Sequence, residues 1–158
     1  LVSGGLAADV DTARAALEQA RSSGRACERF AQMVSALGGP ADLVEQPGAY
    51  LAAAPVVIPV PAARAGIIES VDVHAVGMAI VSLGGGRRRA TDPVDPAVGL
   101  TGVRGIGERV DASTPIALVH ARSEDDARAA VASVQSAVVI GDGPAQPGPV
   151  VRTRIARR

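Results

Sequence analysis

The sequence contains no lysine, no asparagine and no tryptophan, and its aromatic residues are Phe30 and Tyr50 alone. Without lysine the chain has no Schiff-base nucleophile, no attachment point for pyridoxal phosphate, biotin or lipoate, and no Walker-type phosphate-binding lysine. The 16 basic residues, all arginine, balance 16 acidic residues, so there is no basic footprint for nucleic acid. An aromatic content of 1% also argues against base stacking. We therefore expect no nucleic-acid partner.

A single cysteine, Cys27, excludes an internal disulfide and a CxxC metal site. Cys27 lies in a helical pattern beside Ala26 and Phe30, so we expect a buried, inert thiol. No apolar run approaches the roughly 18–20 residues that span a bilayer, and the N-terminus lacks the pattern of a signal peptide. We expect no membrane partner and a cytoplasmic location.

The first fifty residues predict two helices. Asp11 is the expected N-cap of the first, which ends at Ser22-Ser23-Gly24. The second is expected over residues 25–37 and is closed by Gly38-Gly39-Pro40. Its apolar stripe consists of Ala26, Phe30, Met33, Val34 and Leu37. Two short helices have little core of their own and need a partner surface.

The remainder alternates between strand and helix patterns, which predicts an α+β fold with a small mixed α/β domain. Strands are expected at 66–71, 98–100, 115–120 and 150–155, and at 56–58 on a sheet edge because prolines flank it. A glycine-rich hairpin loop is expected at 102–107 and a further loop at 141–149.

Two helices are expected in this remainder. The first is capped by Asp72 and runs to Leu83, where glycines end it, and Gly77 is expected to allow close backbone packing. The second begins with a capping box of Ser123 and Asp126. Its expected core face consists of Ala127, Ala130, Val131, Val134, Ala137 and Val138.

The triple glycine before Arg87-Arg88-Arg89 is the first candidate site, because glycines beside arginines can cradle a phosphate. Here the glycines follow a helix, whose dipole presents its negative end to the loop. We therefore expect a helix C-cap and a solvated basic turn.

The other candidate residues do not form a predicted catalytic or metal site. His74 and His120 have no ligand partner at metal spacing, and a strand-ending His120 is expected to satisfy a hydrogen bond. The carboxylates of Glu124-Asp125-Asp126 favour a helix N-terminus, while Asp92 and Asp95 beside prolines are turn formers. We expect no catalytic, substrate-binding or metal-ligating residue in this chain.

Residues 65–87 are far more specific than any short motif: they resemble the opening of the C-terminal domain of the thymidine and pyrimidine-nucleoside phosphorylases. The resemblance continues in register through 92–100, 106–111 and 115–121. The helical start, with Ser3-Gly4, residues 30–34 and Gly39-Pro40, resembles the segment that the family carries before this domain. The triple glycine is more similar to the thymidine-specific bacterial branch.

That family phosphorolyses thymidine reversibly to thymine and 2-deoxyribose 1-phosphate, as homodimers with the active site in a cleft between a helical and an α/β domain. The resemblance implies that the phosphate-binding, base-binding and catalytic residues all lie upstream of this chain, and that no position here inherits them. His74 and His120 do not match the motif of the family histidine. The implied partners are the missing N-terminal domains, with nucleoside and phosphate bound by the parent enzyme and no cofactor.

The resemblance assigns residues 1–53 to the large α/β domain of the parent and 54–158 to its C-terminal α+β domain. The absence of an initiator Met at Leu1 fits the expectation that an upstream segment has been removed. Residues 107–110 through 115–116 also resemble the barrel-sandwich hybrid of biotinyl and lipoyl carriers, but without lysine a carrier is excluded. We also consider that Arg87 or Arg104 supports closure of the parent's cleft.

Two alternatives stay open at this point. The chain is a non-enzymatic structural or binding module, or part of a related AMP or broad pyrimidine-nucleoside phosphorylase. A fragment should expose the apolar stripe of the Phe30 helix, whereas an independent module should bury it.

Overall fold

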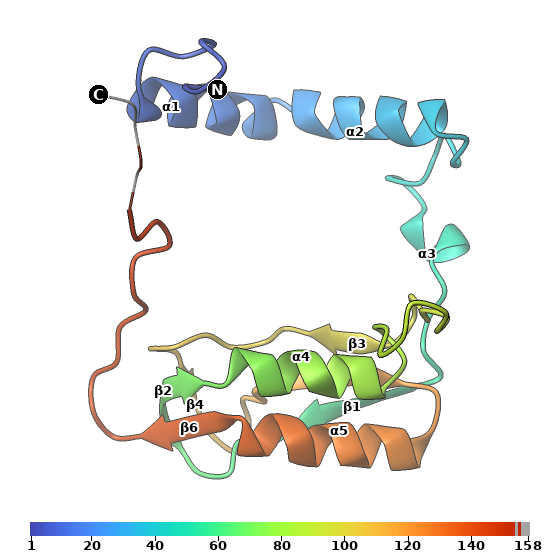
Figure 1. The fold of residues 1–158 in the computed structure, drawn as a ribbon, viewed down its shortest axis with the longest axis vertical. Helices are drawn as coiled ribbons and strands as arrows, with labels where there is room; N and C mark the ends of the chain where they lie inside the picture. Colours follow the sequence, from blue (N-terminus) through green and yellow to red (C-terminus); the bar gives the residue numbers. More distant parts are fainter. Residues whose placement is uncertain (154, 156–158) are drawn as a thin grey trace. The chain divides into compact units, whose positions relative to one another are not determined.

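The computed structural model describes residues 1–153 and 155 of the chain (Figure 1). Within these residues the chain forms five helices and two three-stranded antiparallel sheets, which confirms the predicted α+β class. Backbone contacts divide the chain into two compact units, Leu1–Ala52 and a second that begins at Ala53. None of the helices in the described part is long and apolar enough to cross a membrane.

The first unit contains helices α1 (Val10–Ser22), α2 (Arg25–Ala36) and α3 (Pro47–Tyr50). The predicted N-cap Asp11 is wrong. Asp9 has the extended backbone of a cap, and its carboxylate accepts the Thr12 N–H at 2.7 Å. Asp11 instead lies inside the first turn, where a carboxylate favours the helix dipole. The predicted end at Ser22 and the second helix are confirmed within one residue.

The first unit buries very little apolar surface. Ala13 is its one buried hydrophobic residue among those that the structure describes. Most of the α2 stripe is exposed, with Phe30 at 47% and Leu37 at 81%, and Val34 is half-buried. Cys27 is exposed as well, so the predicted buried thiol is wrong. Helical periodicity places Cys27 on a face of α2, but nothing in the unit covers that face.

The second unit contains both sheets. The first sheet has the order β1-β5-β3, and the second sheet has the order β4-β2-β6. Their strands are β1 (Val56–Val60), β2 (Gly66–Val71), β3 (Gly99–Thr101), β4 (Arg109–Val110), β5 (Ala117–Ala121) and β6 (Val138–Gly141). β1 lies at an edge, as its prolines require, because a proline cannot donate to a ladder hydrogen bond.

Helices α4 (Val73–Ser82) and α5 (Glu124–Ser136) lie side by side (Figure 1), and both predicted caps are confirmed. The Asp72 carboxylate accepts the Ala75 N–H at 2.9 Å. Ser123 Oγ accepts the Asp126 N–H at 3.1 Å and donates to the Asp126 carboxylate at 2.7 Å. Gly84, with a φ of 95°, ends α4 in the left-handed conformation that glycine favours.

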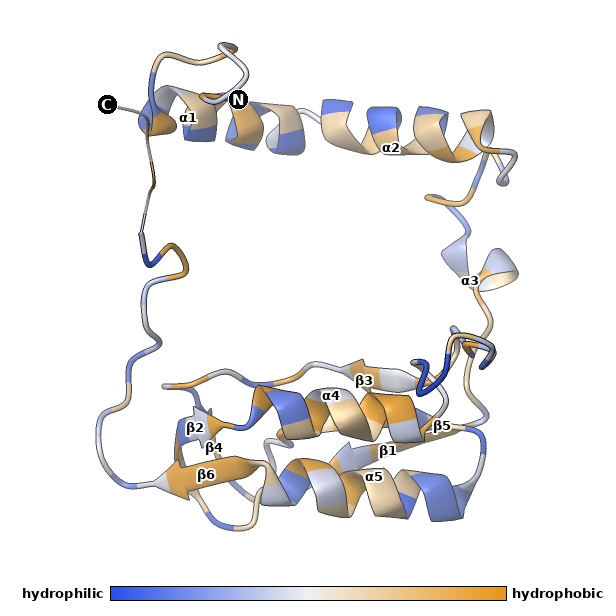
Figure 2. Cartoon of the chain, viewed as in Figure 1, coloured by the Kyte–Doolittle hydropathy of each residue, from blue (hydrophilic) through white to orange (hydrophobic). Residues whose placement is uncertain are grey.

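The main core forms where α5 packs on the first sheet. Ala127, Ala130 and Val134 are buried as predicted. They pack with Val60, Ala79, Ile116, Ala117, Val119 and Ala121. Figure 2 shows the hydrophilic N-terminal end of α5 and the hydrophobic strand β6 that follows the helix. The apolar face of α5 therefore packs against the first sheet, and its acidic first turn is exposed to solvent.

Four details of the predicted second unit are wrong. Val138 begins β6 instead of ending the α5 core face, because Ala137 caps the helix. Residues 102–107 are no simple hairpin loop, since β4 in the second sheet follows them before β5. A Cβ at Gly77 would meet nothing within 4 Å, so Gly77 supports no close packing among the residues that the structure describes. Residues 150–153 and 155 form no strand, and residue 154 lies outside the described residues.

Candidate functional site

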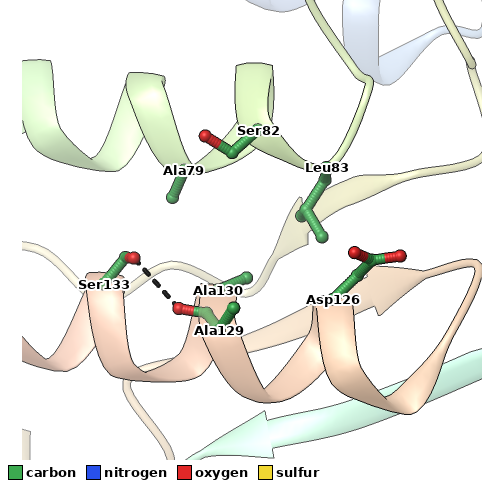
Figure 3. Close-up of a pocket in the computed structure, with 7 residues that line it drawn as sticks. All are labelled: Ala79, Ser82, Leu83, Asp126, Ala129, Ala130 and Ser133. Atoms are coloured by element: carbon green, nitrogen blue, oxygen red, sulfur yellow. Dashed lines mark hydrogen bonds between the residues drawn. The ribbon is translucent and has the colours of Figure 1, made fainter.

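A groove of about 270 Å³ lies between α4 and α5 (Figure 3). It is lined by Ala79, Ser82, Leu83, Asp126, Ala129, Ala130 and Ser133. Figure 3 shows Ala79 and Leu83 pointing from α4 toward α5. Most of the lining side chains are small, three alanines and two serines, and leave this space open.

The polar side chains of this groove are already paired within the protein. Ser133 Oγ donates to the Ala129 carbonyl at 2.9 Å, as the dashed line in Figure 3 marks. Ser82 Oγ accepts from the Arg88 guanidinium at 2.9 Å, and Asp126 accepts from Ser123. None of these groups is a nucleophile beside a base, so the groove offers space without the elements of a reaction.

A second hollow, of about 250 Å³, lies where residues 96–101 approach His120. Thr101 Oγ1 and His120 Nε2 are hydrogen bonded at 2.8 Å. This bond confirms the prediction that His120 satisfies a hydrogen bond. His74 lies exposed in the first turn of α4. The two histidines are therefore on different elements, since His120 belongs to β5.

The basic turn after α4 also follows its prediction. Arg87, Arg88 and Arg89 are exposed. The Asp92 carboxylate accepts the backbone N–H groups of Arg88 and Arg89 at 3.1 and 2.8 Å. These two donors, which a phosphate cradle would need, are thus taken by Asp92. The turn therefore ends helix α4, and the Asp92 carboxylate is hydrogen bonded within it.

An ion pair that the sequence does not predict joins this loop to the start of α5. Arg122 donates two hydrogen bonds to the Asp95 carboxylate, at 2.6 and 2.9 Å, in the bidentate geometry that guanidinium groups favour. The Asp95 N–H also bonds the Gly84 carbonyl at 2.9 Å. The Arg122 guanidinium, and after it the Ala97 N–H, hold the pKa of the Asp95 carboxyl below its ordinary value.

Arg104 is similarly held by its own loop. Its guanidinium donates to Glu108 at 2.9 Å, and the Gly105 N–H donates to the other carboxylate oxygen at 2.7 Å. The Gly105 N–H, and after it Arg104, hold the pKa of the Glu108 carboxyl below its ordinary value. Within the described residues, no three His, Cys, Asp or Glu side chains gather into a group that would hold a metal ion.

Comparison with known proteins assigns this architecture to a class. Residues 67–141 match the family described as the pyrimidine nucleoside phosphorylase C-terminal domain. The matched segment begins in β2 and ends with β6, so it covers the second sheet and both helices of the second unit. A pyrimidine nucleoside phosphorylase C-terminal domain is therefore present in this chain.

The similarity extends beyond that domain. The chain is 54% identical to a thymidine phosphorylase of Burkholderia lata over 142 residues, which are 90% of this chain and 32% of that protein. Thymidine phosphorylases of Burkholderia cenocepacia and Burkholderia orbicola are 52% and 51% identical over the same shares. The predicted resemblance to a C-terminal portion of thymidine phosphorylase is confirmed, and the chain spans about a third of the length of these curated relatives.

Proposed function

We propose that this chain is the C-terminal part of a thymidine phosphorylase, a pentosyltransferase that interconverts thymidine and phosphate with thymine and 2-deoxyribose 1-phosphate. The identity of 54% to the Burkholderia lata enzyme supports this assignment. In the reaction a phosphate oxygen forms a bond to C1′ of the sugar while the bond from C1′ to the base nitrogen breaks. The electron pair of that bond leaves with thymine, so the protein must position both substrates and stabilise developing charge.

The role proposed for this chain is structural. Residues 1–53 belong to the large α/β domain of the parent, and residues 54–158 form the domain that braces the wall of its cleft. The exposed apolar stripe of α2 carries this proposal, since Phe30 is 47% and Leu37 81% exposed. An independent module would bury such a stripe, because exposed apolar area costs roughly 25 cal/mol per Å² in water.

We propose that the chain alone has no phosphorolytic activity. In the described residues the three polar side chains of the α4–α5 groove are already hydrogen bonded: Ser82 to Arg88, Asp126 to Ser123, and Ser133 to the Ala129 carbonyl. Two arginines of the second unit, Arg104 and Arg122, form ion pairs with Glu108 and Asp95. Phosphate and thymidine are then bound by the upstream part of a cytoplasmic, homodimeric parent.

A chimera tests the assignment. The segment of the Burkholderia lata enzyme that matches this chain is replaced by the chain itself, and thymine release from thymidine is measured with and without phosphate. We expect phosphate-dependent release from the chimera and none from the isolated 158-residue chain. The matched control is the Burkholderia enzyme cut off before the replaced segment, which should be inactive.

Two outcomes would contradict the proposal in different ways. A chimera that folds and assembles but releases no thymine would argue against the enzymatic assignment. Thymine release by the isolated chain would argue against its structural role.

A further inference from the structure

Helices cover one face of the first sheet, and the opposite face carries no charged side chain. The inward face consists of Val56, Ile58, Val60, Leu100, Ala117, Val119 and Ala121, which join the core with α5. The register of β1, β5 and β3 places the alternate residues on the opposite face. These outward residues are Val57, Pro59, Gly99, Thr101, Leu118 and His120.

The composition of this outer face is unusual for a sheet face in water. An antiparallel sheet with one solvated face alternates apolar and polar residues, whereas a sheet covered on both faces has apolar residues at successive positions. No outward position of this sheet carries Asp, Glu, Lys or Arg. Val57 is 49% and Leu118 37% exposed, in the edge strand and the central strand. The absence of charge and the exposed Val57 and Leu118 favour a sheet that is covered on this face as well.

The two polar side chains on this face are hydrogen bonded to each other. His120 pairs across the strands with Gly99, and its ring reaches Thr101 Oγ1 at 2.8 Å. Because Gly99 has no side chain, a hollow of about 250 Å³ opens beside the ring. The face therefore presents a flat apolar area, Val57 and Leu118, next to a hollow that a protruding side chain can fill.

The other side of the same unit is built differently. The first turn of α5 carries Glu124, Asp125 and Asp126, and Arg128 pairs with Glu124 and Asp125 at 3.3 and 3.0 Å. Exposed ion pairs of this kind keep their hydration and are typical of a surface that stays in solvent. The exposed start of α5 is therefore charged, whereas the outer face of the first sheet carries no charge.

We propose that the outer face of the first sheet is the surface on which the upstream part of the same polypeptide packs. This inference rests on the proposed function. About two thirds of each relative lies outside the segment that this chain matches, and the matched family is a C-terminal domain, so the missing chain precedes it. The occupant is a segment without charge at its centre, with one side chain that enters the hollow beside His120.

Cysteine labelling tests the covering directly. Leu118→Cys is introduced in a Cys27→Ser background, because Cys27 is itself exposed. The rate of reaction with a maleimide is compared between the isolated chain and the chimera with the Burkholderia lata enzyme. Arg128→Cys, whose parent side chain is 64% exposed on α5, is the matched control.

We expect the reaction at position 118 to slow at least about tenfold in the chimera, because a covered thiol reacts only when the interface opens. The reaction at position 128 should not change. Equal rates at position 118 in the two proteins would overturn the inference even if the chimera is active. Protection at 118 in the isolated chain that disappears on dilution would assign the face to a second copy and would also overturn it.

The two proposals fail separately. Loss of thymidine phosphorolysis by a folded chimera argues against the proposed function, whereas the labelling rate at position 118 decides the docking face. If the chimera does not fold, a cysteine at the aligned position of the Burkholderia lata enzyme gives the same measurement. A fast reaction at that position in the intact enzyme would overturn the docking inference.

Discussion

The two units of the chain specify their helices by the same local signals but differ in what those helices pack against. Helices α1 and α5 have 13 residues each, and each is preceded by a cap residue, Asp9 and Ser123 respectively, whose side chain accepts a backbone N–H. Yet α1 buries Ala13 alone, whereas α5 buries Ala127, Ala130 and Val134. Caps and periodicity therefore specify a helix and its apolar face, but only a covering sheet turns that face into a core.

The difference predicts that a substitution in the core of the second unit lowers the free energy of unfolding more than one on the exposed stripe of the first unit. Ile116 is 1% exposed in the second unit, and Leu37 is 81% exposed at the end of α2. Ile116→Ala should lower the free energy of unfolding of the second unit by about 2–5 kcal/mol, because it removes buried methyl groups and leaves a cavity. Leu37→Ala should change stability by no more than about 0.5 kcal/mol. Urea unfolding followed by circular dichroism measures both.

A probe confined to one unit sharpens this test. Tyr50, the single tyrosine, lies in α3 of the first unit, and its hydroxyl donates to Asp42 at 2.6 Å. Its fluorescence should follow the first unit, so Ile116→Ala should move the circular dichroism transition and leave the tyrosine transition in place. If both transitions move together by the same amount, the two units unfold as one and the comparison fails.

The elements that the sequence predicts well are helices with a capping or terminating residue at an end. Asp72 and Gly84 bracket α4, and Ser123 begins α5, so local chemistry specifies these helices. Strand β6 has no such signal, because Val138 follows the helix cap Ala137 without a glycine or proline between them. Strand β4 has only two residues, too few for a periodic pattern, and its pairing with β2 decides its existence.

The second prediction concerns Gly77 on the outer side of α4. A Cβ there would meet nothing within 4 Å, so Gly77→Ala should stabilise the second unit by about 0.5–1 kcal/mol through the higher helix propensity of alanine. Urea midpoints of the isolated chain measure the gain. Gly84→Ala is the control and should destabilise, because Gly84 has a φ of 95°. A loss of stability on Gly77→Ala would show that glycine is required there within this chain.

The smallest expected effect is a pH dependence in the second unit. The pKa of the Asp95 carboxyl is lowered by Arg122 and the Ala97 N–H, so its stabilising contribution is complete above the unfolded pKa, near 3.8. That contribution is lost as the pH falls through the lower folded pKa. Asp95→Asn should therefore be less stable than the natural chain at pH 7, and the difference should shrink toward pH 3.

Urea midpoints between pH 7 and pH 3 measure this difference. Glu45→Gln in the first unit removes one carboxylate from an exposed position and should leave the profile of the second unit unchanged. A difference between Asp95→Asn and the natural chain that is constant with pH would exclude the carboxylate charge as its cause.

Residues that act together at a distance are the part of the candidate site that sequence patterns miss. Asp95 and Arg122 are 27 positions apart and meet only because β3 and β5 pair. His120 and Thr101 meet for the same reason, 19 positions apart. By contrast, Asp92 caps a turn within four residues, a local contact that its neighbouring proline already indicates. Spacing predicts contacts inside a turn, and strand register decides the rest.

The interleaving of the two sheets makes the second unit indivisible. Each sheet combines one strand that precedes α4, β1 or β2, with two strands that follow it. No single point in the loop after α4 therefore divides the polypeptide into two pieces that each hold a complete sheet. During synthesis on the ribosome neither sheet can close while only its first strand has emerged, and the second sheet waits for β6, so folding of this unit must come late and as a whole.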